Sequence, residues 1–499
     1  MTPITILIII ILYFTVLFCI SYISGHKADN AGFFSGNKKS PWYVVAFATV
    51  GAAISGVTFV SVPGMVATSS FSYMQMVLGF AVGQFIIAFV LIPLFYRMNL
   101  VSIYEYLENR FGISTYKTGA WFFFISKMLG AAIRLFVVCV VLQLLVFSPL
   151  ELPFILNVLF TVGLVWLYTF RGGVKSLIWT DSFKTFCLIF SVGLCIYYIA
   201  GNLQFSVKEM LTAIDHSTMS KTFFFDDIND KKYFFKQFFA GVFTVIATTG
   251  LDQDMMQKTL SCKNPRDSQK NMIVGGVLQI FIILLFLMLG VLLYTFAGNN
   301  GIALPAKGDE VFPFLATQGY FPSIVGFLFI IGLVSAAYAA AGSALTALTT
   351  SFTVDILESP KRKSEEEIAT IRTKVHIAMA IVMGLVIIVI NILNNTSVID
   401  TVYKLASYTY GPILGLFIFG IFTKKKVKDR YVPIVALVSP FVCFIFDLNS
   451  KTWFNGYEFS HERLILNALF TFVGLCLIIQ KKQNNNNEIN NNEYNESAN

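Results

Sequence analysis

The sequence predicts an all-α polytopic membrane protein with about thirteen transmembrane helices. The chain of 499 residues is 56% hydrophobic, contains 51 Phe and is only 13% charged, whereas charged residues supply about a quarter of an ordinary soluble domain. Uncharged stretches of roughly 20 residues, the length that crosses a lipid bilayer, recur from end to end. This composition argues against soluble enzymes, nucleic-acid-binding proteins and secreted disulfide scaffolds.

The first apolar run, residues 3–23, is predicted to be a retained helix with its N-terminus outside. No basic residue precedes it, and His26, Lys27, Lys38 and Lys39 follow it, which reverses the polarity of a cleaved signal peptide. Twelve further spans are expected at residues 41–67, 73–96, 118–147, 151–170, 178–200, 233–250, 271–297, 321–350, 374–394, 401–422, 431–447 and 463–480.

The loops between these spans alternate between the two sides of the membrane, and one set carries most of the basic loop residues. This set comprises residues 24–40, 97–117, 171–177, 251–270, 351–373, 423–430 and the C-terminal tail. Because basic loops stay in the cytoplasm, the C-terminus is predicted to be cytoplasmic. The tail, residues 481–499, is nearly all Asn and Glu and is expected to be disordered.

Two of the predicted spans contain residues that interrupt a membrane helix. The span 41–67 includes Gly51, Ser55, Gly56, Thr58 and Pro63. The span 233–250 includes Thr244, Thr248, Thr249 and Gly250. Interruptions free backbone carbonyls, which in a membrane must be buried in protein or face an ion or a cavity. A discontinuous helix is therefore expected at each position; for residues 41–67 a kinked helix with small residues for close packing is the alternative.

The second interrupted span lies five spans after the first, so the two run in opposite directions. Residues 41–200 and 233–422 are therefore predicted to be inverted five-helix repeats, an architecture of secondary transporters with sites near the membrane midplane. The remaining segments are an N-terminal helix and loop (1–40), an outer loop that either caps the mouth or is a solvated connector (201–232), two C-terminal helices (423–480) and the tail (481–499).

Ionisable residues inside predicted spans are functional candidates because each costs at least about 2.5 kcal/mol near the bilayer centre. They are Lys127, Arg134, Asp181, Lys184, Lys236 and Lys404. Arg134 has no acidic residue within a helical turn, so its partner is either an anionic group of a substrate or a counter-ion or carbonyl cluster from another helix.

Several motifs together resemble those of the sodium/solute symporters, a family of sugar, proline, pantothenate and sialic acid carriers. They are FFSGNKKSPWYVVAFATVGAAISGVTFVSVPG, SIYEYLENRFG, YTFRGGVKSLIWTDSF, GLDQDMMQK and YAAAGSALTALTTSFTVDIL, and the resemblance runs from about residue 3 to about residue 450. It implies a leucine-transporter-type inverted-repeat fold, alternating access, Na⁺ as coupling ion and location in a bacterial inner membrane.

The resemblance also implies two sodium sites. The main site would use backbone carbonyls of Gly51, Ile54 and Ala336, but Ala339 and Ala340 stand where the family places two hydroxyls. The second site, found in some members, would use Asp181, Ser343 and Thr346. Lys184, in place of the usual Gln, shares a helix face with Asp181 and could neutralise it. We therefore predict weak, altered or absent sodium coupling.

The substrate pocket is expected between the two broken helices. By resemblance and polarity its candidate residues are Ser55, Thr58, Tyr73, Gln75, Arg134, Thr244 and Tyr408. Each has an alternative role in satisfying helix backbones or neighbouring spans. The identity of the solute and the oligomeric state do not follow from the sequence.

The leading functional prediction is a carrier that takes up a small polar solute. No catalytic motif appears, so enzymatic activity is not expected. A transporter-like sensor or non-pumping subunit is one alternative, and an exchanger or proton-coupled carrier is another. A proton role would fall to Asp181, which Lys184 would hold in its charged form.

Overall fold

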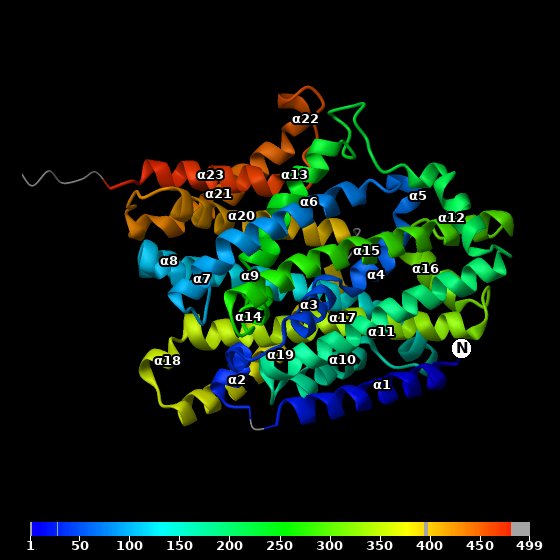
Figure 1. The fold of residues 1–499 in the computed structure, drawn as a ribbon, viewed down its shortest axis with the longest axis horizontal. Helices are drawn as coiled ribbons and strands as arrows, with labels where there is room; N and C mark the ends of the chain where they lie inside the picture. Colours follow the sequence, from blue (N-terminus) through cyan, green and yellow to red (C-terminus); the bar gives the residue numbers. More distant parts are fainter. Residues whose placement is uncertain (1, 27, 394–397, 481–499) are drawn as a thin grey trace, which may run out of the picture.

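The computed structural model describes residues 2–26, 28–393 and 398–480, and the regular structure of these residues is helical (Figure 1). The predicted all-α fold is confirmed. The predicted disordered tail lies outside the described residues.

Among the described residues, eight helices are long and apolar enough to cross a membrane, two bent pairs do so together, and three apolar helices are shorter. The eight are α1 (Pro3–Ser24), α6 to α7 (Tyr73–Met98), α9 with η3 and η4 (Ile113–Leu150), α11 (Gly173–Asn202), α15 (Pro265–Asn299), α17 with η7 (Ser323–Ile356), α19 (Glu365–Leu393) and η8 with α21 (Asp429–Leu448). The shorter three are α10 (Phe154–Thr169), residues Tyr408–Phe422 of α20 (Val398–Phe422) and α23 (Arg463–Leu477). These elements match the predicted stretches, while the exact number of membrane crossings stays a prediction.

Both predicted interruptions are present as breaks between half-helices. The first separates α3 (Trp42–Ala53) from α4 (Gly56–Gly64), which are bent by 63°. The second separates α13 and the π-helical turn η6 (Phe234–Gly250) from α14 (Gln253–Thr259), bent by 71°. The alternative of a merely kinked helix, which the sequence left open for residues 41–67, is therefore wrong.

Helix α14 corrects one expectation from the sequence. Its residues belong to 251–270, which the alternation of the predicted spans assigns to a cytoplasmic loop. Every residue of α14 is buried, so the second broken helix extends beyond the predicted span. Charged side chains that pair with one another inside the protein gave this half-helix the composition of a loop.

The helices of the two predicted repeats pack reciprocally. The second helix of the first repeat, α6, packs on the broken helix of the second repeat, and α15, its counterpart, packs on α3 and α4. In the same way α9 packs on α20, and α11 packs on α17. This exchange is expected of inverted repeats, although the repeat boundaries stay predictions.

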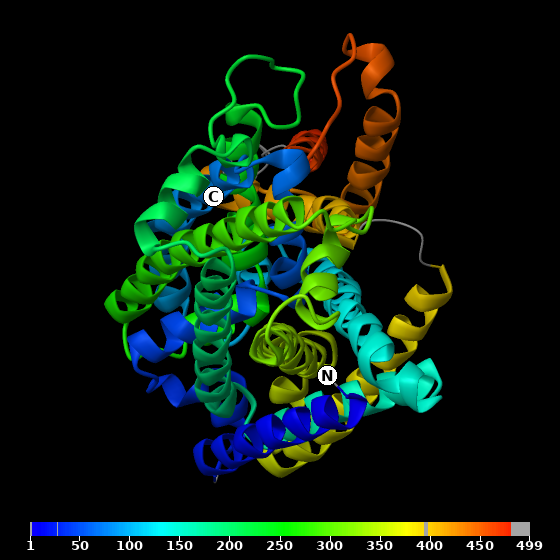
Figure 2. The same ribbon diagram turned by 90° about the vertical axis from the view of Figure 1, so that its right-hand side faces the viewer.

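Elements outside these repeats lie at the periphery. Helix α1 and the C-terminal helices α21 and α23 flank opposite sides of the bundle (Figure 1 and Figure 2). The short helices α2 (Asn30–Ser35), α8 (Glu105–Arg110) and α18 (Ser359–Arg362) gather at one end, and α12 (Val207–Asp215) and α16 (Gly308–Thr317) at the other. The loops predicted to face the cytoplasm and the outside are thus at opposite ends.

Two glycines allow α6 and α13 to approach closely. A Cβ atom added to Gly79 would lie 2.1 Å from the Phe238 carbonyl oxygen, and one added to Gly241 would lie 2.2 Å from that of Met76. Both clashes are with backbone, so a side chain at either position would have to push the helices apart. Small residues at such crossings are typical of membrane helix packing.

We expect Gly241→Ala to lower the stability of the protein by about 1–3 kcal/mol, the usual cost of overpacking. Gly193→Ala is the matched control, because a Cβ atom there meets nothing within 4 Å and alanine favours a helix over glycine. Thermal unfolding of both variants in detergent would measure the difference. Equal or higher stability of Gly241→Ala would contradict the close approach.

Candidate functional site

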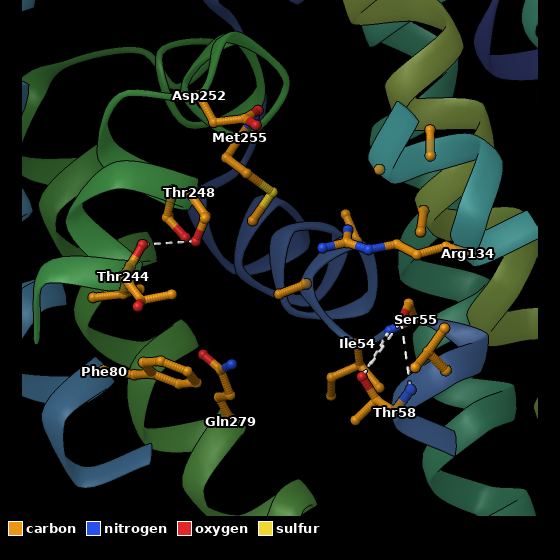
Figure 3. A pocket seen from close by; sticks show the side chains of 18 of the residues that line it. Ile54, Ser55, Thr58, Phe80, Arg134, Thr244, Thr248, Asp252, Met255 and Gln279 are labelled. Carbon is orange, nitrogen blue, oxygen red and sulfur yellow. Dashed lines mark hydrogen bonds between the residues drawn. The ribbon is translucent and has the colours of Figure 1, made fainter. Parts of the chain in front are cut away.

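A cavity of about 150 Å³ lies between the two broken helices. Its lining comes from the breaks themselves and from α6, α9, α15, α17 and α20. Figure 3 shows Ile54, Ser55 and Thr58 on one side, Thr244 and Thr248 on the other. The structure therefore places a cavity where the sequence predicts a substrate pocket.

Five of the seven predicted substrate-binding residues line this cavity, and two do not. The five are Ser55, Thr58, Tyr73, Arg134 and Thr244. Gln75 instead joins the start of α6 to the outer loop: its Nε2 donates to the Lys232 carbonyl at 2.8 Å, and its Oε1 accepts from the Phe224 N–H at 3.2 Å. Tyr408 points to α21, where its hydroxyl donates to Asp447 at 2.9 Å.

Ser55 and Thr58 begin the second half of the first broken helix. Ser55 is the N-cap of α4, and the two side chains each bond to the other's backbone N–H at 3.4 Å. These are long hydrogen bonds, so both hydroxyls keep the capacity to bind a solute. The cap also explains why the chain can restart a helix at this point inside a membrane.

The second broken helix presents hydroxyls from the opposite side of the cavity. Thr248 donates its hydroxyl to the Thr244 carbonyl at 2.8 Å, which satisfies a helix backbone group. The hydroxyl of Thr244 itself has no hydrogen-bond partner within residues 2–26, 28–393 and 398–480. Gln279 of α15 adds an amide, whose oxygen accepts from Gln84 at 3.1 Å.

Arg134 supplies a positive charge to the cavity. It lies on α9, is half-buried and projects toward the space between the broken helices (Figure 3). In the described part of the chain no carboxylate or carbonyl is hydrogen-bonded to its guanidinium. Asp254 is near enough to interact electrostatically with Arg134, but no carboxylate in the described residues forms a close ion pair with it.

The other charges at the cavity are paired with one another. Lys127 of α9 lies 2.7 Å from Asp254 and 3.1 Å from Asp252. Asp252 is the N-cap of α14, where it accepts from the Asp254 N–H at 2.9 Å, and it also accepts a hydrogen bond from the Tyr410 hydroxyl. Two aspartates therefore pair with Lys127, whereas Arg134 forms no such close ion pair with the described residues.

Asp181 lies beside two lysines, and all three side chains are buried. Lys184 Nζ lies 3.1 Å from Asp181 Oδ1, which confirms the predicted pairing. Lys258 Nζ, from α14, lies 2.8 Å from the other carboxylate oxygen, Oδ2. Ser343 donates to the same Oδ2 at 2.8 Å and accepts a hydrogen bond from Lys258.

Thr346, the last predicted residue of the second sodium site, stays outside this cluster. It is buried, and its hydroxyl has no hydrogen-bond partner among the described residues. The carboxylate of Asp181 is therefore occupied by ammonium groups and one serine.

The predicted main sodium site lies where the end of α3 meets α17. Ile54 and Ala340 both line the cavity, and a Cβ atom on Gly56 would contact the Ala337 methyl at 3.3 Å, next to Ala336. Gly51 lies in the last turn of α3. Ala339 and Ala340, where the resemblance implies two hydroxyls, carry no side-chain oxygen.

Sequence reasoning did not identify Asp252, Asp254, Lys258 or Tyr410. The first three lie in the segment assigned to a loop, where charge is expected. One available signal was the sequence GLDQDMMQK directly after the second interruption, since a cap and a half-helix should follow a break.

Comparisons with known proteins agree with this architecture. The model of the sodium:solute symporter family matches residues 33–429. The sodium/sialic acid symporter NanT of Aliivibrio fischeri is 25% identical over 84% of this chain and 83% of its own length. The sodium/sialic acid symporter SiaT of Proteus mirabilis is 24% identical over 81% of this chain and 82% of its own length.

A solved structure shares the fold. It is the substrate-bound outward-open state of a Na⁺-coupled sialic acid symporter, with a TM-score of 0.81 and 18% identity, and the match covers 95% of this chain and 98% of that one. The leucine-transporter-type fold predicted from the motifs is thereby confirmed. Because the family model covers most of the sequence, the chain belongs to the sodium:solute symporter family.

Proposed function

We propose that the protein is a secondary active transporter that takes up a small polar, acidic solute by alternating access. The observation that carries this proposal is Arg134, whose guanidinium faces a cavity between two broken helices and makes no hydrogen bond or close ion pair with the described residues. An unpaired charge within a membrane is costly. A carboxylate would neutralise it, with the guanidinium donating two parallel hydrogen bonds.

The rest of the cavity favours a solute with hydroxyl or amide groups. Ser55, Thr58 and Thr244 present hydroxyls, and Gln279 presents an amide, while Phe80 and Val57 add apolar surface. A few polar groups on an apolar wall are typical of small-molecule sites. Sialic acid, the solute in the names of two relatives, combines a carboxylate with hydroxyls and an amide and is the first solute to test.

Uptake is proposed to be coupled to sodium through a weakened main site. The supporting observation is that Ala339 and Ala340 are buried on α17 at the positions of the predicted hydroxyl ligands. Sodium is a hard cation that favours several oxygen ligands, and methyl groups cannot supply them. The absence of hydroxyls at residues 339 and 340 also favours a second candidate, an exchanger of this fold that is not driven by sodium.

Substitution of Arg134 is expected to weaken binding of the acidic solute. Charge-assisted hydrogen bonds contribute about 1.5–3 kcal/mol, so Arg134→Gln should weaken binding of N-acetylneuraminate by about 10- to 100-fold. Thermal-shift titration of the purified protein measures this affinity. Arg171→Gln is the matched control, because Arg171 is exposed on the loop after α10.

Two results would contradict this role for Arg134. One is an unchanged affinity in Arg134→Gln. The other is a screen of sugars, amino acids and carboxylates in which neutral solutes alone stabilise the wild-type protein.

Restoring hydroxyls to α17 is expected to strengthen sodium coupling. The variant Ala339→Ser/Ala340→Ser adds two oxygens at the main site and should raise sodium-stimulated uptake of labelled solute into proteoliposomes by about 10-fold at low sodium, a gain of about 1.4 kcal/mol in sodium affinity. Ala341→Ser, on the next position of the same buried helix, is the control. A strong sodium-driven overshoot in the wild-type protein, measured against a potassium control, would refute the weakened site.

A further inference from the structure

We propose that the ammonium group of Lys258 is a built-in cation that takes the place of a second sodium ion, so that Asp181 and Ser343 bind no free cation. The consequence is that the carrier moves at most one sodium ion with each solute, and this consequence rests on the proposed transport function. The contacts on which the inference depends are independent of transport.

The first argument is the position of the ammonium group. Lys258 Nζ lies 2.8 Å from Asp181 Oδ2 and donates to the Ser343 hydroxyl. Each of these three residues is at most 1% exposed. Of the residues that the resemblance assigns to a second sodium ion, Asp181 and Ser343 are therefore already bound to a positive charge, which a sodium ion would have to displace.

The second argument is that Asp181 has no carboxylate oxygen left over. Lys184 Nζ lies 3.1 Å from Oδ1 and 3.3 Å from the Tyr338 carbonyl oxygen. The same ammonium lies 4.0 Å from the centre of the Tyr168 ring, a favourable cation–π contact. A sodium ion on either side of this carboxylate would meet an ammonium group of the same charge.

The third argument is charge balance along a buried chain of ion pairs. From the cavity inward, Lys127 contacts Asp254 at 2.7 Å, Asp254 lies 3.7 Å from Lys258, and Lys258 contacts Asp181. With Asp252 and Lys184 at the two ends, the paired residues are three lysines and three aspartates, and Arg134 adds a positive charge near Asp254 at the cavity end. A further cation would add an uncompensated charge in a place where water is excluded.

The same balance predicts the effect of removing Lys258. Without its ammonium, Asp181 Oδ2 and the hydroxyl of Ser343 lose their positive neighbour, and a free cation could take that position. The side chain of Thr346, buried and without a hydrogen-bond partner in the described residues, is three residues further along the same helix. Lys258→Ala should therefore convert a position filled by the protein into a sodium site.

The test is the sodium response of the purified protein at constant ionic strength, with choline as the replacement cation. Lys258→Ala should show a saturable, sodium-dependent rise in Tm on the order of a few degrees beyond that of the wild-type protein. The extra rise should disappear in Lys258→Ala/Asp181→Asn. Lys236→Ala is the matched control, since Lys236 is also buried but contacts carbonyl oxygens rather than a carboxylate.

An equilibrium measurement of ²²Na⁺ binding covers the case in which Lys258→Ala does not fold. The wild-type protein is expected to bind at most one sodium ion, and Lys258→Met, which keeps an apolar stem of similar length, should fold without the charge. Two sodium ions bound per wild-type molecule, or a folded Lys258→Ala with the sodium response of the wild type, would overturn the proposal. Absence of solute uptake would instead count against the proposed function, because neither measurement requires transport.

Discussion

The structure depends on one constraint: a helix that is broken inside a membrane must satisfy its free backbone groups within the protein. At the first break Ser55 caps α4 with a neutral hydroxyl. At the second break the cap is Asp252, a carboxylate. A carboxylate at this depth requires a counter-ion, and Lys127 of α9 and the hydroxyl of Tyr410 on α20 supply its partners. The second break therefore fixes the relation of α14 to two other helices.

The buried lysines and the arginine at the cavity differ in whether they pair with a carboxylate. Lys127, Lys184 and Lys258 all contact aspartates, and none needs a ligand to be neutralised. Arg134 shares the surroundings of Lys127 but has no such partner in the described part of the chain. Since a buried ion pair broken by removal of one member is strongly destabilising, the paired set is suited to hold helices together. The guanidinium, which forms no such pair, is suited to reversible binding of an acidic solute.

The predictions that succeeded depend on local properties of the sequence. Hydropathy located the spans, and small and polar residues located both breaks. Lys184 could be assigned to Asp181 because residues three apart on a helix share a face. The predictions that placed Gln75 and Tyr408 in the pocket used resemblance and polarity. Gln75 binds the outer loop and Tyr408 binds Asp447, so a polar residue near a break can equally serve the connection next to it.

The sequence by itself determined the membrane class, the two interruptions and the positive charge of α9. Only the tertiary structure decided what those charges meet. Lys258 and Asp181 are 77 residues apart, and their contact depends on how α14 folds back against α11 and α17. Hydrophobic periodicity reports which face of a helix is buried and not which distant helix covers it. For the same reason, a buried segment whose charges pair with distant residues cannot be distinguished from a solvated loop by its composition.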